Sequence, residues 1–195
     1  MTISRKEQIL ENLINSAPFE GWNDKTLEKA AKEVTGDEKY AYIDFPEGIS
    51  EAANYFIEIN DGEMEKALSS MSITQLRIRD RIKAIVMVRL LQYEKHKEAV
   101  RKLVAFYALP QNAGKALTNI SNTVSKMWYA AGDTSSDFNY YTKRMLLAGV
   151  YTSTLLYWLS DESDNYKETE KFLARRIENV MSIQQLKKKA REIFA

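Results

Sequence analysis

Residues 21–46, GWNDKTLEKAAKEVTGDEKYAYIDFP, decide the fold of the N-terminal part of the chain. Apolar side chains recur there at spacings of three and four residues, which places them on one face of a helix over residues 26–34. These side chains are Leu27, Ala30, Ala31 and Val34. Gly36 ends that helix, and the short segment 38–43 leads into the Phe45-Pro46 turn. With apolar helical spacing also over residues 3–16 and 49–59, the pattern predicts helix, turn, helix and then a linking helix.

Helical spacing continues through the rest of the chain, which contains only 3 prolines and 7 glycines in 195 residues. We therefore predict an all-α protein of about eight to ten helices. The later helices are expected at 73–109 (one or two), 113–131 closed by Gly132, 135–160, 165–181 with an Asn165–Glu168 capping box, and 184–194. The predicted regions are 1–60 (helix-turn-helix), 61–182 (ligand-binding) and 183–195 (a short basic tail helix).

Composition argues against catalysis. The chain has no cysteine, which excludes disulfides and thiolate chemistry, and its single histidine is His96. The residue three before it is Tyr93, so the Glu-x-x-His pair of a di-iron helix is missing. His96 sits in a charged helical segment, where an exposed or locally paired imidazole is expected. We predict no catalytic residue, no metal site and no cofactor.

Charge is distributed unevenly although the formal net charge is only +1. Residues 1–60 carry 6 basic and 12 acidic side chains, whereas residues 182–195 carry 4 basic and 1 acidic. The start of the chain lacks the apolar core of a signal peptide, so a bacterial cytosolic location is expected. The uncharged run 145–160 is about sixteen residues, shorter than a membrane-spanning helix requires, and is expected to be a core helix.

The N-terminal pattern resembles the TetR family of bacterial regulators. The residues that carry this resemblance are Gly21-Trp22, Leu27, Ala30-Ala31, Gly36 and Tyr42-x-x-Phe45-Pro46. The charges of the helix-turn-helix do not suit phosphate contacts, because Asp37, Glu38, Asp44 and Glu47 accompany Lys39 alone, and Gly48 stands where these regulators usually have lysine. We predict a degenerate helix-turn-helix without DNA binding, in which Trp22 fills the core.

A second resemblance covers most of the chain and rests on residues 127–144, MWYAAGDTSSDFNYYTKR, followed by Leu147-Ala148, Val150-Tyr151, Ser153-Thr154, Trp158, Asp161, Phe172-Leu173 and Arg175-Arg176-Ile177. These motifs resemble the lipid-binding accessory proteins of ubiquinone biosynthesis, the ninth member of the Coq series, in their alphaproteobacterial form. The resemblance implies a TetR-like helical fold without DNA recognition. It also implies a non-catalytic protein that binds isoprenoid quinone intermediates and presents them to the di-iron demethoxyubiquinone hydroxylase at the membrane surface.

Within that stretch, acidic, aromatic and basic side chains fall three or four residues apart, as in protein–protein hot spots. The resemblance implies a partner-binding surface there. Its predicted members are Trp128, Gly132, Asp133, Asp137, Tyr140, Tyr141 and Arg144. The alternative is that Asp137 caps its helix and pairs with Arg144 inside the domain, while the tyrosines fill gaps. Family members often have tryptophan at the position of Tyr140.

A lipid cavity is expected in the larger helical region, although stripes of this kind are usually ordinary core. The candidate lining residues are Ile85, Val88, Leu103, Phe106, Tyr107, Leu117, Met127, Leu147, Tyr151 and Leu155. A tunnel among them would need the small side chains of Ala148, Gly149 and Ser153 to leave space.

The last residues form a basic amphipathic pattern, typical of a helix that lies on anionic lipid, with a frayed tail as the alternative. The predicted membrane contacts are Leu186, Lys187, Lys188, Lys189, Arg191, Ile193 and Phe194. The leading hypothesis is thus a peripheral accessory protein at the inner membrane of a bacterium, and the alternative is a ligand-responsive TetR-type transcriptional regulator. Because TetR-like domains commonly dimerise, a homodimer is expected.

Overall fold

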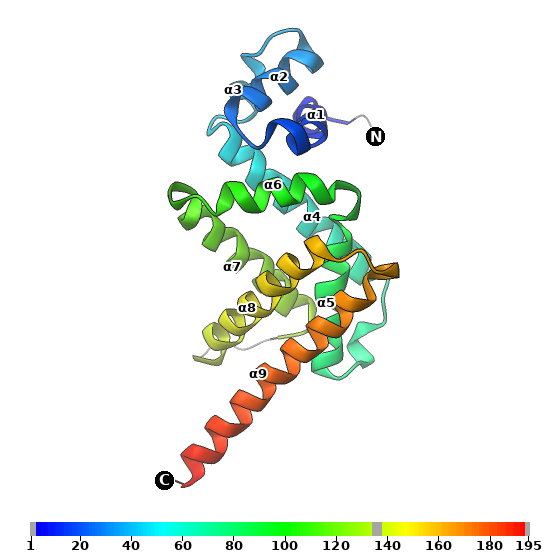
Figure 1. The fold of residues 1–195 in the computed structure, drawn as a ribbon, viewed down its shortest axis with the longest axis vertical. Helices are drawn as coiled ribbons and strands as arrows, with labels where there is room; N and C mark the ends of the chain where they lie inside the picture. The colour runs from blue at the N-terminus through cyan, green and yellow to red at the C-terminus, as the bar shows by residue number, and fades with distance from the viewer. Residues whose placement is uncertain (1–2, 134–137, 194–195) are drawn as a thin grey trace. The chain divides into compact units, whose positions relative to one another are not determined.

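The computed structural model describes the backbone of residues 3–133 and 138–193, and the side chains of residues 3–133 and 140–182. In these ranges the chain is helical and contains no strand, which confirms the all-α prediction (Figure 1). The α-helices are α1 (Arg5–Glu20), α2 (Asp24–Thr35), α3 (Tyr40–Asp44), α4 (Ile49–Ser69), α5 (Ile78–Leu91), α6 (Lys97–Tyr107), α7 (Ala113–Ala130), α8 (Phe138–Ser160) and α9 (Lys167–Ile193). Short 3₁₀ helices are η1 (Ile73–Gln75), η2 (Glu94–His96), η3 (Pro110–Asn112) and η4 (Asp164–Tyr166).

The helices form two compact units. Unit 1 comprises the chain up to Glu63 together with Gln92–Asn119, and unit 2 comprises Met64–Leu91 together with the chain from Ile120 onward. The backbone passes from one unit to the other inside α4, at the end of α5 and inside α7, so neither unit is a continuous stretch of sequence.

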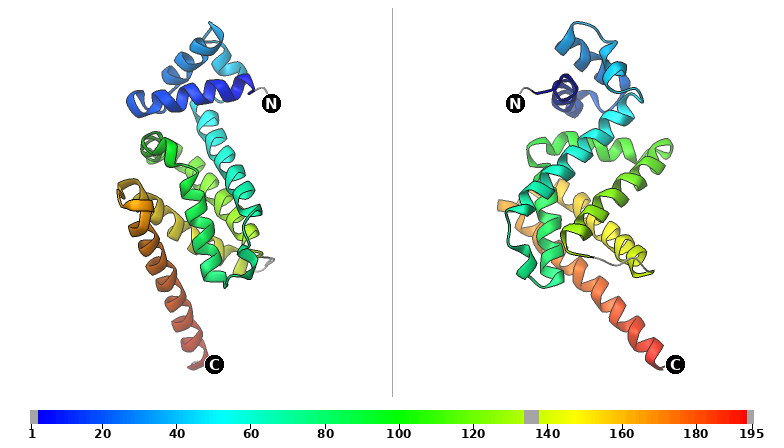
Figure 2. Two further views of the ribbon diagram at one scale, coloured as in Figure 1. Left: turned by 90° about the vertical axis from the view of Figure 1, so that its right-hand side faces the viewer. Right: turned by 180° about the vertical axis from the view of Figure 1, so that it is seen from behind.

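Unit 1 contains the helix-turn-helix, in which α1 packs against α2 (Figure 2). A capping box starts α1: the Glu7 N–H donates to the Ser4 hydroxyl and the Ser4 N–H to the Glu7 carboxylate. Gly36 ends α2 with a φ of 82°, in the left-handed region that glycine adopts most easily. The helix stop predicted at Gly36 is confirmed.

The N-terminal helices are longer than predicted. The first one was expected to end at Ser16, but α1 continues through Pro18 to Glu20. Pro18 lies in the last turn of α1, and the helix stops at Gly21, whose N–H donates to the Ala17 carbonyl (2.9 Å). The linking helix α4 likewise extends beyond residue 59, to Ser69.

An aromatic cluster fills the interior of unit 1. The ring of Phe56 lies 5.6 Å from that of Trp22 and 5.5 Å from that of Tyr93, and all three residues are at most 5% exposed. The indole N–H of Trp22 donates to the Ala99 carbonyl at 2.9 Å, so its polar atom is satisfied inside the core. The interpretation of Trp22 as a core residue is confirmed.

The predicted run 73–109 contains two α-helices, α5 and α6, with η2 between them. The first part of the run is not α-helical, because η1 occupies residues 73–75 and α5 starts only at Ile78. The predicted end of this run at Pro110 is close to the observed one, since α6 ends at Tyr107 and η3 begins at Pro110.

Unit 2 contains α8 and α9, which run antiparallel and are joined by a short connection (Figure 1). The predicted Asn165–Glu168 capping box is wrong, because Asn165 has a φ of 53° and α9 begins at Lys167. Asp161 caps the start of α9 instead. Its carboxylate accepts hydrogen bonds from the Thr169 N–H at 2.8 Å and from the Thr169 hydroxyl at 2.6 Å. An acid eight residues upstream thus replaces the local cap.

The two helices predicted at 165–181 and 184–194 are one continuous helix, α9, which runs to Ile193. The predicted break at 182–183 is wrong, because neither glycine nor proline occurs there and nothing interrupts the backbone hydrogen bonding.

Candidate functional site

Residues 127–144 lie where α7 ends and α8 begins, and the end of α7 has a defined cap. The Asp133 N–H donates to the Trp128 carbonyl and the Gly132 N–H to the Tyr129 carbonyl, both at 2.9 Å. These two bonds form a Schellman motif, which requires a left-handed residue, and Gly132 has a φ of 82°. The predicted closure of this helix at Gly132 is confirmed.

Asp133 is the acidic centre of this junction, and two cations of α8 share it. Its side chain is 5% exposed and lies 2.6 Å from Lys143 Nζ and 3.3 Å from Arg144 Nη1. Arg144 is itself buried, and it also donates to the Ser125 hydroxyl (3.2 Å) and to the Tyr140 carbonyl (3.3 Å). Charge-assisted bonds of this kind hold the first turns of α8 against α7. Asp137, which the alternative interpretation pairs with Arg144, lies outside the described residues.

Aromatic rings surround the two cations. The Arg144 guanidinium carbon lies 3.3 Å from the ring centroid of Tyr140 and 5.2 Å from that of Tyr129. Lys143 Nζ lies 5.6 Å from the Trp128 ring, whose N–H donates to the Lys143 carbonyl at 3.1 Å. A hydrogen bond with the Tyr129 side chain lowers the pKa of Tyr140, and the charge of Arg144 acts in the same direction. The cation–π contacts of Arg144 and Lys143 favour these orientations of the Tyr140, Tyr129 and Trp128 rings.

The junction also carries large side chains that are exposed. Tyr129 is 61% exposed, Tyr141 69% and Met145 75%. The rings of Tyr140 and Tyr141 meet edge to face, with their centroids 5.1 Å apart. We call Tyr129, Tyr141 and Met145 the exposed trio. Exposed aromatic side chains beside a charged cluster have the composition of a protein-binding hot spot.

The predicted partner residues thus divide into two groups. Gly132 and Tyr141 are exposed, whereas Trp128 and Tyr140 are half-buried and Arg144 is buried. The side chain of Asp133 is buried as well. The buried Arg144 contacts the ring of Tyr140, which in turn contacts the exposed ring of Tyr141.

The sequence prediction missed several residues of this junction. Met145 follows Tyr141 by four residues, so helical spacing could have identified it. Tyr129 and Lys143 lie inside the quoted stretch, where only three-dimensional contacts distinguish them from their neighbours. Ser125 lies one turn before Tyr129 on α7, and nothing in the sequence signals its bond to Arg144.

The candidate lipid residues are divided between the two units. In unit 2, Ile85, Met127, Leu147 and Tyr151 are buried, and Val88 and Leu155 are half-buried. In unit 1, Leu103 is buried, Phe106 and Tyr107 are half-buried, and Leu117 is 69% exposed. Leu117 lies on the outer face of α7.

The position of Gly149 differs from the one that the expected tunnel requires. Gly149 is exposed, and a Cβ built on it would meet nothing within 4 Å, so it faces away from the interior that Leu147 and Tyr151 occupy. Its position two residues from each of them puts it on the opposite face of α8. The expectation that Gly149 leaves space inside is therefore wrong.

The hydroxyl of Tyr107 takes part in a polar network of unit 1. It donates to Asn54 Oδ1 at 2.7 Å, and Asn119 Nδ2 donates to the same oxygen (2.7 Å) and to the Tyr107 hydroxyl (2.9 Å). Burial raises the pKa of Tyr107, so this phenol stays protonated and acts as a donor. The network joins α4, α6 and α7.

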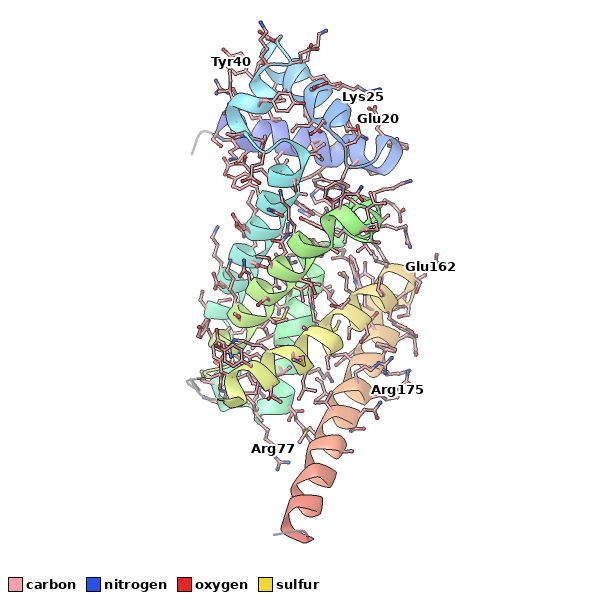
Figure 3. All side chains as sticks on the ribbon, turned by 90° about the vertical axis from the view of Figure 1, so that its left-hand side faces the viewer. Glu20, Lys25, Tyr40, Arg77, Glu162 and Arg175 are labelled. Atoms are coloured by element: carbon pink, nitrogen blue, oxygen red, sulfur yellow. The ribbon has the colours of Figure 1, made fainter. Side chains whose placement is uncertain are left out.

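Three cations of the helix-turn-helix, Arg5, Lys6 and Lys29, form ion pairs within unit 1. Arg5 binds Asp44 through two bonds of 2.7 and 2.9 Å, and Lys6 binds Glu51 at 2.9 Å. The side chain of Tyr42, on α3, donates to Glu28 at 2.7 Å. Figure 3 shows Glu20, Lys25 and Tyr40 on this part of the chain; Glu20 pairs with Lys29. Pairing of this kind makes these three cations less available to phosphate groups.

His96 packs edge-on against the Phe56 ring, with centroids 6.3 Å apart. Burial lowers its pKa, and the nearby Lys95 acts in the same direction. Among the described residues, no group of three or more His, Cys, Asp or Glu side chains could hold a metal ion. The imidazole is a packing residue of unit 1.

The predicted membrane contacts lie in the last turns of α9. The backbone there is helical to Ile193, whereas the side chains of Leu186, Lys187, Lys188, Lys189, Arg191 and Ile193 and the whole of Phe194 lie outside the described residues. Over the described part of the chain, none of the helices has both the length and the apolar character that a bilayer crossing requires.

Residues 113–184 match the family model of COQ9. Similar curated proteins include the "Ubiquinone biosynthesis protein COQ9, mitochondrial" of Rattus norvegicus (28% identity, 91% of this chain, 60% of that protein) and of Homo sapiens (26%, 91% and 58%). The COQ9-B protein of Xenopus laevis is 29% identical over 91% of this chain and 63% of its own length. The chain therefore spans about three fifths of the length of these relatives.

Among solved structures, a TetR transcriptional regulator from Nitrosomonas europaea is similar, with a TM-score of 0.72, 20% identity, and coverage of 88% of this chain and 95% of the regulator. At that identity the similarity concerns the fold. The matched family segment contains α7, α8 and most of α9, and thus the entire junction. Residues 113–184 thus match the COQ9 family model, the chain is similar to curated COQ9 proteins over 91% of its length, and its fold is TetR-like.

Proposed function

We propose that this chain is a non-catalytic accessory protein of ubiquinone biosynthesis. It binds an isoprenoid quinone intermediate and presents it to the di-iron demethoxyubiquinone hydroxylase. The relatives with the name "Ubiquinone biosynthesis protein" support the pathway. The observation that carries the proposal is the α7–α8 junction, where an exposed aromatic surface lies inside the COQ9-matched segment.

The exposed trio is the centre of the proposed partner surface. Large rings that are already ordered lose little conformational entropy when a partner covers them. The Arg144 guanidinium, which Asp133 binds, lies 5.2 Å from the Tyr129 ring and 3.3 Å from the Tyr140 ring, and Tyr140 in turn contacts Tyr141. A folded protein partner therefore meets a preformed surface at this point.

The lipid is proposed to occupy unit 2, among Ile85, Met127, Leu147 and Tyr151. Aliphatic and aromatic side chains of three helices, α5, α7 and α8, supply the apolar environment that an isoprenoid tail requires. The chain is further proposed to lie at the inner membrane of a bacterium through the basic end of α9, and to form a homodimer.

A ligand-responsive TetR-type regulator is the second candidate, favoured by the structural similarity to the Nitrosomonas europaea protein. It requires a helix-turn-helix with cations available for phosphates. In this chain Arg5 and Lys6 are engaged with Asp44 and Glu51. The accessory role is therefore preferred.

The partner proposal is tested by capture of the purified hydroxylase on the immobilised chain. Tyr129→Ala and Tyr141→Ala are expected to weaken capture. Leu156→Ala is the matched control, because Leu156 is 51% exposed on the same helix as Tyr141. Equal capture by all three variants and the wild type would contradict the proposed surface.

The lipid proposal is tested by native mass spectrometry and solvent extraction of the protein purified from cells that make ubiquinone. Leu147→Trp fills the proposed site with a larger side chain and is expected to lower the amount of bound isoprenoid. Leu117→Trp, at an exposed position, is the control and is expected to retain it. A wild-type protein that carries no isoprenoid would contradict the proposal.

A further inference from the structure

Arg81, on α5, binds the α7–α8 junction from outside it. Its Nη1 donates to the carbonyl of Ala131 at 2.5 Å, fifty residues later in the chain. Its other described bonds go to η1 and its flanks: Nε donates to the Ile73 carbonyl (3.1 Å), and Nη2 to the carbonyls of Thr74 and Leu76 (3.1 Å for Leu76). All four acceptors are main-chain oxygens, so Arg81 fixes backbone segments rather than a charged side chain.

This contact supplies something that α7 lacks. The last turn of α7 contains no basic residue, although helix C-termini expose carbonyls and attract positive charge. The Schellman motif uses the carbonyls of Trp128 and Tyr129, which leaves the Ala131 carbonyl for Arg81. The cation that caps α7 thus comes from another helix.

Ala131 leads directly into the residues that organise the partner surface. A Cβ on Gly132 would lie 3.3 Å from Arg81 Nη1, so the backbone passes close to the guanidinium. Asp133 follows Gly132, and its carboxylate forms ion pairs with Lys143 and Arg144. A shift of the Ala131 carbonyl therefore moves Asp133 and, with it, the cations that hold the tyrosine rings.

We infer that Arg81 is a positioning residue of the partner surface, which it fixes by anchoring Ala131 to the η1 turn. The expected effect on the backbone of residues 131–133, called the loop below, rests on the hydrogen bonds alone. The expected effect on binding rests in addition on the proposed function. In its described hydrogen bonds, Arg81 contacts none of the exposed trio. It acts through the backbone of Ala131, Gly132 and Asp133.

The test uses hydrogen–deuterium exchange of the full chain together with capture of the hydroxylase. The variants are Arg81→Gln and Arg81→Lys; lysine keeps the charge but cannot bridge the two segments with a planar fork. Arg77→Gln is the matched control, because it removes the same charge from an exposed side chain in the same region (Figure 3). The amides of Gly132 and Asp133 report on the loop, because both are bonded in the Schellman motif.

We expect exchange at Gly132 and Asp133 to rise in both Arg81 variants, and hydroxylase affinity to fall about tenfold, with α1–α3 and the Arg77→Gln protein unchanged. Unchanged exchange at these amides would overturn the inference, and so would faster exchange with unaltered affinity. If the wild-type chain captures no hydroxylase, the partner proposal fails, while the exchange result still decides whether Arg81 fixes the loop.

Discussion

The interior of unit 1 and the α7–α8 junction of unit 2 place the same kinds of side chain in opposite ways. In unit 1, the rings of Trp22 and Phe56 are buried and the Lys115–Glu47 ion pair lies at the surface. At the junction, the Asp133–Arg144 pair is buried and Tyr141 is exposed.

The difference separates stability from recognition. Buried rings contribute apolar area to the fold, whereas exposed pairs contribute little because water screens them. An arrangement with buried charges and exposed rings costs desolvation energy and leaves apolar surface uncovered. Such an arrangement is the expected one where a second molecule binds, and four changes test this comparison.

The largest effect is expected for Phe56→Ala in unit 1. The ring packs between Trp22 and Tyr93, so its removal leaves a cavity and should lower the free energy of unfolding by about 3–5 kcal/mol. Urea denaturation measures this loss. Hydroxylase capture by the fraction that remains folded should be unchanged, and a selective loss of capture would break the division between the two regions.

Next is Asp133→Asn, which keeps the shape of the side chain but removes the charge that Lys143 and Arg144 share. Because Arg144 is buried, we expect a loss of about 3 kcal/mol in the free energy of unfolding. Glu47→Gln, in the exposed pair with Lys115, is the control and should cost below about 1 kcal/mol. Equal costs in urea denaturation would show that the two pairs do not differ.

Tyr141→Ala should act on binding rather than on stability. We expect hydroxylase affinity to fall by about 2 kcal/mol, roughly thirtyfold, with unfolding changed by less than about 0.5 kcal/mol. Phe19→Ala is the matched control in unit 1, since Phe19 is 87% exposed. Titration calorimetry with the hydroxylase separates the two, and equal losses for both variants would remove the special status of the junction.

The smallest effect concerns Asp161, which caps α9. Burial raises the pKa of this carboxyl, but hydrogen bonds from Thr169 and Ser163 outweigh burial and lower the pKa to about 2. The pKa of an aspartate in an unfolded chain is about 3.9. The stabilisation of the folded state by this carboxylate is therefore complete above that pH and is lost as the pH falls towards 2.

Thr169→Val removes the hydroxyl donor to Asp161 and should reduce this acid-dependent stabilisation by on the order of 1 kcal/mol. Urea denaturation at several pH values between 2 and 5 measures it. A variant with the same pH dependence as the wild type would show that the hydroxyl does not stabilise the charged carboxylate.

Local sequence signals predicted most of the helices, because spacing and caps act within a few residues. Gly36 and Gly132 end helices where the sequence indicated, since glycine adopts a positive φ at little cost. The same local reasoning was wrong at Asn165, where the cap comes from Asp161, and at residues 182–183, where no breaker interrupts α9.

The sequence by itself determined the all-α class and the lack of cysteine chemistry, because these depend on composition and short-range periodicity. The stretch 127–144 was proposed as a partner surface from its composition together with a family resemblance. Only the tertiary structure decided which members of that stretch face outward. Burial of Arg144 depends on the packing of α8 against α7, and the bond from Arg81 to Ala131 joins residues fifty positions apart. Contacts over such distances leave no periodic signal in the sequence, since their geometry arises only when the helices pack together.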